Sequence, residues 1–240
     1  MAELVLSVSR VKAFLDCKRK YFYLYEQKMP RKQWDHFDMG TLVHGTLENF
    51  HQSFRKDGQD QLKRLMKESF AKQRKEMGTV KNTVLIEARD LLADYLKDIE
   101  ENGIGSEIVT LEEKFEIKLN DRFNLLGFVD RLDLDKDGIY HIKDYKTNKN
   151  MKYMEPFQLQ AYGLYLLNKF PDIQCFRGSY IILRFNGQAL TYDFNIEDVE
   201  KIKSQLIEYG DRIMEEKKWA PTQSPLCGWC DFKDTCLNSW

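Results

Sequence analysis

The chain has 240 residues, 42% hydrophobic and 13% aromatic, enough to bury a sizeable core, which excludes a disordered or fibrous protein. Lys and Arg number 37 against 38 Asp and Glu, and the net charge of −1 excludes a uniformly basic nucleic-acid wrapper and an acidic tail protein. No hydrophobic run approaches the roughly 18 residues that span a bilayer, and no signal-peptide pattern opens the chain. We therefore expect a soluble, cytoplasmic protein with no membrane partner.

The first hundred residues are predicted to be mostly helical. Apolar side chains recur at helical spacing in four stretches, and Ser7 or Ser9 can cap the first of them. The stretches begin at Val11, Leu42, Leu62 and Val84.

From Val109 the apolar pattern alternates, which predicts a strand whose apolar face is broken only by Glu113. Two further strands follow across short turns, so the three are expected to form an antiparallel meander. A helix, two strands and an amphipathic helix complete an α/β pattern. The expected ranges are 109–119, 123–134 and 139–147 for the meander, then 156–169, 180–185, 190–194 and 196–217.

Carboxylates and a lysine converge on the second and third of these strands. Alternation puts Asp144 and Lys146 on one face, with Tyr145 pointing away, and the hairpin can bring Asp130 alongside. Converging carboxylates repel each other unless a cation lies between them, and oxygen ligands suit Mg²⁺ or Mn²⁺. A lysine there could help a water molecule attack a phosphodiester. The same residues could instead be solvated charges at the hairpin edge.

A calcium loop is a competing interpretation of the same segment. Five residues occupy positions 1, 3, 5, 6 and 12 of the EF-hand pattern: Asp133, Asp135, Asp137, Gly138 and Asp144. An EF-hand also needs helices on both sides and a glutamate at position 12, whereas the flanks here are predicted strands.

These motifs resemble the RecB-like branch of the PD-(D/E)XK nucleases. The resemblance rests on GFVDRLD with Asp130, IKDYKT with Asp144 and Lys146, and QLQAY, whose Gln158 and Tyr162 match a QxxxY element on one helix face. It implies a restriction-endonuclease-like core with a mixed central sheet, a helical N-terminal part and a catalytic role for these five residues. Gln158 and Tyr162 would position the DNA backbone or buttress the lysine.

The resemblance also implies a Mn²⁺ or Mg²⁺ centre. Its ligands would be His44 in MGTLVHGTLENF, Asp130, Asp144 and the main-chain carbonyl of Tyr145. Glu113 could face the same site or pair with a basic side chain.

Three cysteines, Cys227, Cys230 and Cys236, lie close together near the end of the chain. Zinc or an iron-sulphur cluster needs a fourth ligand, and Cys17 is the leading donor. Cys175 has no partner at a matching spacing and is predicted to be a packing residue.

The cysteine spacing resembles the iron-sulphur clasp of AddB nuclease domains and the CRISPR-associated Cas-four exonucleases. It implies a 4Fe-4S cluster that ties the N-terminal helix to residues 220–240 within one domain of residues 1–240. Zinc and incidental thiols remain alternatives, because the ligand set alone does not exclude them.

Charge is segregated along the chain. Basic residues outnumber acidic ones eight to two from Arg10 to Lys32 and seven to two from Lys63 to Lys81. The first patch is interleaved with aromatic residues and suits a groove for single-stranded nucleic acid, whereas the second could be a solvated helix face. The aromatic residues are Tyr21, Phe22, Tyr23 and Tyr25.

The resemblance implies a metal-dependent DNA nuclease, an exonuclease on single-stranded ends more than an endonuclease, in repair, recombination or CRISPR adaptation. One alternative is a DNA-binding accessory subunit that depends on a helicase or a CRISPR integrase. The chain carries no GxxxxGK[ST] phosphate loop, so ATP-driven unwinding would come from such a partner. The other alternative is a zinc-stapled RNA-processing nuclease.

Overall fold

The computed structural model of the chain describes residues 4–32, 34–57, 61–149 and 154–237. The chain divides into two compact units. Unit 1 comprises Met1–Gln33, Phe115–Gly127 and Glu200–Trp240, and unit 2 comprises Trp34–Lys114 and Phe128–Val199. The single domain of residues 1–240 stays a prediction, and residues 238–240 of the predicted clasp lie outside the described residues.

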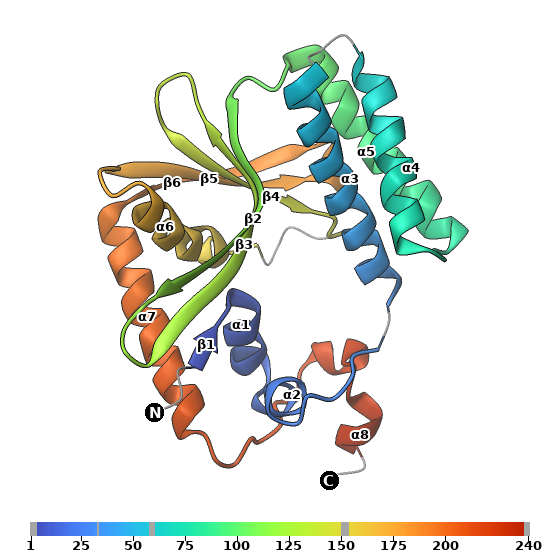
Figure 1. Ribbon diagram of the computed structural model, residues 1–240. Helices are drawn as coiled ribbons and strands as arrows, with labels where there is room; N and C mark the ends of the chain where they lie inside the picture. The colour runs from blue at the N-terminus through green and yellow to red at the C-terminus, as the bar shows by residue number, and fades with distance from the viewer. Residues whose placement is uncertain (1–3, 33, 58–60, 150–153, 238–240) are drawn as a thin grey trace. The chain divides into compact units, whose positions relative to one another are not determined.

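Three long helices form the first part of unit 2 (Figure 1): α3 Asp35–Asp57, α4 Leu62–Met77 and α5 Asn82–Asn102. They bury a shared apolar cluster that includes Leu42 and Phe50. Gly45 allows α4 to pack tightly on α3, because a Cβ there would lie 2.3 Å from the Gln73 side chain. Within the described residues, no helix is both long and apolar enough to cross a membrane.

A mixed sheet forms the rest of unit 2. Strand β3 runs antiparallel to β4, β4 parallel to β5, and β5 antiparallel to β6, while β2 pairs with β3. Helix α6 packs closely on β5. Gly163 permits this close contact, because a Cβ at this position would lie 2.6 Å from the Phe176 ring. This is the α/β arrangement expected from the sequence. The bounds are β2 Glu107–Lys118, β3 Phe123–Leu134, β4 Tyr140–Lys146, α6 Phe157–Lys169, β5 Cys175–Ile182 and β6 Gln188–Asn195.

Two sequence predictions in unit 2 are wrong in detail. The strand expected over residues 180–185 ends at Ile182, and Leu183–Phe185 form a 3-10 turn, η3. Strand β2 does not alternate throughout, since Glu112 has a φ of 44°. This left-handed residue acts as a β-bulge, so Ile108 is buried before it and Phe115 after it. Strands, not helices, flank the segment that matched the EF-hand pattern.

The first predicted helix is broken in unit 1. Helix α1 Val8–Asp16 is capped by the Ser7 side chain, which accepts the Arg10 amide at 3.1 Å. Cys17 is extended and separates α1 from α2 Lys18–Tyr21, which continues into a π-helix, η1 Phe22–Glu26. A short strand that the sequence did not predict, β1 Leu4–Leu6, pairs in parallel with the start of β3.

Residues near the start and near the end of the sequence pack together within unit 1. After α7 Ile196–Glu215, Trp219 stacks on Tyr21 with ring centroids 5.5 Å apart, and Glu216 pairs with Lys18. The 3-10 helix η4 Pro225–Trp229 and helix α8 Lys233–Leu237 follow. The C-terminal segment is therefore anchored at residues 216–219, before its three cysteines.

Candidate active site

Strands β3 and β4 bring two predicted carboxylates together. Arg131 pairs with Lys143, so the same register carried one residue further places Asp130 opposite Asp144. Asp130 Oδ2 accepts the Tyr145 amide at 2.9 Å and lies 3.2 Å from His44 Nδ1 of α3. The backbone pairing and α3 thus bring the other three predicted metal-binding residues, His44, Asp144 and Tyr145, close to Asp130.

Glu112 joins this group, which sequence reasoning missed. One ligand atom from each of His44, Glu112 and Asp130 lies within 4.8 Å of the others. Glu113 instead faces away from the group, where its carboxylate accepts the Tyr165 hydroxyl and Lys169 Nζ, each at 2.6 Å. Successive residues of a strand point to opposite faces, so Glu112 and Glu113 do not both join the group. The pairing of Glu113 with Lys169 is the second of the two roles that the sequence left open for it.

Lys146 belongs to a linked set on the same side of β4. Its Nζ lies 2.6 Å from Asp144 Oδ2 and donates to Gln158 Oε1 at 3.0 Å. Gln158 Nε2 donates to Asp144 Oδ1 at 2.7 Å and lies 3.0 Å from the Tyr162 hydroxyl. The two α6 residues therefore hold the acid and the lysine in place, as their four-residue spacing suggested.

Crowded charges shift the pKa values of the site. Burial lowers the pKa of His44, but hydrogen bonding to Asp130 and its negative charge raise it to about 9. Burial, with Asp130 nearby, raises the pKa of Glu112 to about 7. Burial also raises the pKa of Asp144 to about 6, against the opposing effect of Lys146. Burial and the neighbouring Asp130 thus make ionisation of both carboxyl groups unfavourable, in spite of the nearby Lys146 and His44.

The donor set fits a divalent cation. Asp144 Oδ2 is buried, and its one polar partner among the described residues is the Lys146 ammonium group 2.6 Å away. Carboxylate oxygens with one imidazole suit Mn²⁺ and Mg²⁺. A cation here would relieve the repulsion between the carboxylates.

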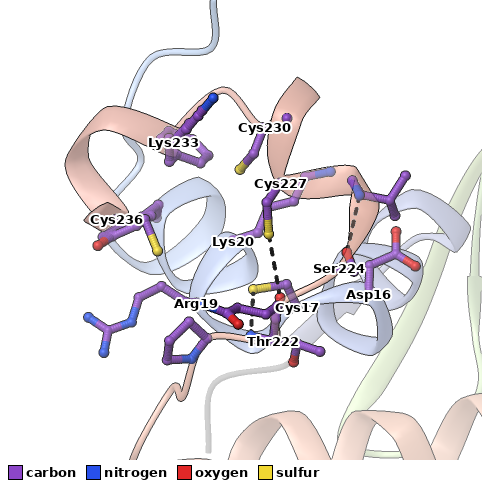
Figure 2. A pocket seen from close by; sticks show the side chains of 16 residues that line it. Asp16, Cys17, Arg19, Lys20, Thr222, Ser224, Cys227, Cys230, Lys233 and Cys236 are labelled. Carbon is purple, nitrogen blue, oxygen red and sulfur yellow. Dashed lines mark hydrogen bonds between the residues drawn. The ribbon is translucent and has the colours of Figure 1, made fainter. Parts of the chain in front are cut away.

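A second candidate site lies in unit 1, where the four predicted cluster cysteines line one pocket of about 310 Å³ (Figure 2). Cys17 Sγ accepts the Thr222 amide at 3.4 Å. No three of these thiols have sulphur atoms within 4.8 Å of one another. Tetrahedral zinc, with Zn–S bonds of about 2.3 Å, would draw them to about 3.8 Å. Cys175 is exposed, so its predicted packing role is wrong.

Two of the four aromatic residues of the first basic patch do not have the predicted role. Tyr21 and Tyr23 are buried, so they pack inside unit 1 and do not face a groove. Phe128, in contrast, is 49% exposed and lies two residues before Asp130, on the same face of β3. In the second patch Lys63 pairs with Glu100 and Lys81 with Asp35, as expected of a solvated helix face.

A model of the PD-(D/E)XK nuclease superfamily matches residues 5–237. No curated protein matches the sequence.

The solved structures that are similar to the chain include the following two. A "putative exonuclease" from Eubacterium rectale is 14% identical, with a TM-score of 0.56, over 94% of this chain and 86% of that one. The crystal structure of SSO0001 is 16% identical, with a TM-score of 0.44, over 100% of this chain and 89% of that one. The likeness to the Eubacterium rectale protein bears on the fold alone. Because the family model spans nearly all residues, the chain belongs to the PD-(D/E)XK nuclease superfamily.

Proposed function

We propose that this nuclease is a metal-dependent deoxyribonuclease of the RecB-like branch that degrades single-stranded DNA from its ends. The observation that carries the proposal is the environment of Asp144. Among the described residues its buried Oδ2 has Lys146 as its one polar partner, at 2.6 Å, and the strand pairing that ends at Arg131 and Lys143 leads directly to Asp130 and Asp144.

The residues that would hold Mn²⁺ or Mg²⁺ are those gathered around Asp130. They are His44, Glu112, Asp130, Asp144 and the Tyr145 carbonyl. When bound, the ion supplies Lewis-acid chemistry, which activates a water molecule and offsets charge on the phosphate. Glu112 is the member that the family resemblance did not include.

Lys146 is the residue that would act on the attacking water. Its ammonium group is fixed by Asp144 and Gln158, so it can orient that water and stabilise negative charge as it develops on the phosphate. Burial raises the pKa of Tyr162, so its hydroxyl stays protonated beside Gln158. Gln158 and Tyr162 thereby act as positioning residues for the lysine.

Phe128 supports single-stranded DNA as the substrate. An exposed aromatic ring can stack on an unpaired base, whereas the bases of a duplex are already stacked on each other. Because Phe128 shares a strand face with Asp130, a base stacked on this ring would have its own phosphate near the carboxylates.

Cleavage of end-labelled linear single-stranded DNA in Mn²⁺ tests the function. We expect the wild type to release label and Lys146→Ala to lose roughly 10³-fold or more of the rate, because lysine and carboxylates act as a unit. Lys149→Ala is the matched control, since this lysine is exposed three residues further along the chain. It should cleave like the wild type.

The same assay separates the alternatives. Cleavage that survives in both Lys146→Ala and Asp144→Ala would reject the site. Absence of cleavage by the wild type would favour the partner-dependent DNA-binding subunit, and a preference for RNA would favour the RNA-processing nuclease.

For the cysteine pocket we propose a 4Fe-4S cluster with a structural role. A cluster of four irons holds thiolates further apart than one zinc ion does, in keeping with the separation of the sulphur atoms. Arg19, Lys20 and Lys233 also line the pocket and would offset the negative charge of a thiolate-bound cluster.

Iron and sulphide analysis of anaerobically purified protein tests the cluster. We expect Cys17→Ser to lose iron and Cys175→Ser, which changes an exposed cysteine in the other unit, to retain it. Stoichiometric zinc in place of iron would favour the zinc alternative. Absence of both metals would show that the four thiols are incidental.

A further inference from the structure

A buried polar network lies behind the metal-binding face of unit 2. The Tyr145 hydroxyl is 3.0 Å from His51 Nε2 and 3.0 Å from the Tyr95 hydroxyl, and Arg131 Nη1 is 3.3 Å from His51 Nε2. All four side chains are buried, and His51 is fully excluded from solvent. Neither the predicted catalytic set nor the predicted metal ligands use these side-chain groups.

The proton positions in this network follow from its donors. Arginine can only donate, so we assign His51 Nε2 as the acceptor and place the ring proton on Nδ1, which is buried and has no hydrogen-bond partner among the described residues. One tyrosine hydroxyl can donate to Nε2 while the other donates to the first hydroxyl. Asp133 balances the charge of Arg131 through two contacts of 2.6 Å. Lys143 Nζ also lies 2.7 Å from Asp133 Oδ2. Burial and the charge of Arg131 lower the pKa of His51, so its ring is neutral.

Three members of the network lie on the same strand or helix as a residue of the proposed metal site. Arg131 follows Asp130 on β3, and Tyr145 follows Asp144 on β4, so each projects from the opposite face of a strand that carries a site carboxylate. His51 lies seven residues after His44, two turns along the same face of α3.

Tyr145 links the two sides most directly. Its side chain bonds within the network, while its backbone amide donates to Asp130 Oδ2 at 2.9 Å. A shift of the Tyr145 ring would therefore move the backbone that contacts Asp130 and separates Asp144 from Lys146. Helix α3 would lose its polar tie to β4 at the same time.

We propose that His51, Tyr95, Arg131 and the Tyr145 hydroxyl are positioning residues that set the separation of His44 on α3 from the carboxylates on β3 and β4. Aliphatic side chains could fill the same volume without the cost of burying polar groups, but they would not fix the register of helix and strands as hydrogen bonds do. The inference rests on the proposed metal site.

Tyr145→Phe tests the proposal by removing one hydroxyl and keeping the ring. We expect its affinity for Mn²⁺ alone, measured without DNA by electron paramagnetic resonance, to fall about 10- to 100-fold, the usual effect of losing an outer hydrogen bond at a metal site. At saturating Mn²⁺ its cleavage rate should return towards that of the wild type. A variant that was merely less stable would not show a weaker Mn²⁺ affinity together with a normal cleavage rate at saturating Mn²⁺.

Tyr21→Phe is the matched control, because Tyr21 is equally buried and its hydroxyl bonds Arg10 Nε at 2.8 Å, but it lies in unit 1. Its Mn²⁺ affinity should equal that of the wild type. A second pair serves if Tyr145→Phe does not fold: His51→Gln, which retains an acceptor, should bind Mn²⁺ more tightly than His51→Leu.

The outcomes separate this inference from the proposed function. If the wild type binds Mn²⁺ and Tyr145→Phe binds it equally well, or if His51→Leu matches His51→Gln, the positioning role is overturned and the metal site stands. If the wild type binds no Mn²⁺, both are overturned.

Discussion

The two candidate sites differ in how their donors are held in place. In unit 2 the carboxylates of Asp130 and Asp144 project from paired strands, and hydrogen bonds from Tyr145 and Gln158 fix them. In unit 1 the thiols come from a break between two helices and from the short segments η4 and α8, where Leu226 and Trp229 are exposed. The donors of the first site are thus held by the fold itself, whereas the thiols of the second would be fixed by the proposed cluster.

Removal of the divalent ion from the first site and of the iron from the second should show the difference between the sites most clearly. Chelation of the divalent ion should leave amide exchange around His44 and Asp144 nearly unchanged. Loss of the iron should lower the protection of residues 220–237 by at least about 100-fold, because binding energy there is folding energy. Hydrogen exchange followed by mass spectrometry measures both. Equal responses of the two sites would contradict the distinction.

The pH dependence of Mn²⁺ binding tests whether His44 and Glu112 of the first site bind the ion. The pKa of His44 is raised to about 9 and that of Glu112 to about 7, and both groups must lose a proton to bind an ion. Apparent affinity should therefore rise with pH, by about tenfold per unit between pH 7 and 9 and more steeply below pH 7.

Calorimetry in buffers of different ionisation enthalpy would count the protons released on Mn²⁺ binding. A Mn²⁺ affinity that did not change between pH 6 and 9 would show that these groups do not bind the ion.

Phe128→Ala tests which unit contacts unpaired bases. We expect single-stranded DNA to bind roughly tenfold more weakly, since one base stacked on an aromatic ring contributes about 1–3 kcal/mol, whereas duplex binding should hardly change. Fluorescence anisotropy without divalent ions measures this. Phe185→Ala, which removes another half-exposed ring from unit 2, is the control and should bind like the wild type. Equal losses for single strands and duplex would argue against stacking.

The smallest expected effect concerns the strained backbone of Glu112. Gly and Ala both remove the carboxylate, so Glu112→Gly and Glu112→Ala should lose Mn²⁺ affinity equally. The left-handed φ of 44° favours glycine, so the Gly variant should be about 1 kcal/mol more stable than the Ala variant. Thermal melts at one pH compare the two. A more stable Ala variant would mean that the backbone stores no strain at this position.

The sequence by itself determined the elements that repeat regularly and the residues placed by local geometry. Alternation put Asp144 and Lys146 on one face of β4, and the hairpin turn set the register that brings Asp130 opposite. Four-residue spacing placed Gln158 beside Tyr162 on α6. These relations depend on neighbours along one or two elements, which is why periodicity was sufficient to predict them.

Only the tertiary structure decided the rest. Packing against α3 and α6 decided that Glu112 lies beside His44 and Asp130 while Glu113 pairs with Lys169, and a pattern with period two does not record such partners. Tyr21 was buried by Trp219, almost two hundred residues away along the chain. His51, Tyr95, Arg131 and Tyr145 met from four separate elements. Contacts between distant segments depend on packing in three dimensions, and no local period in the sequence records them.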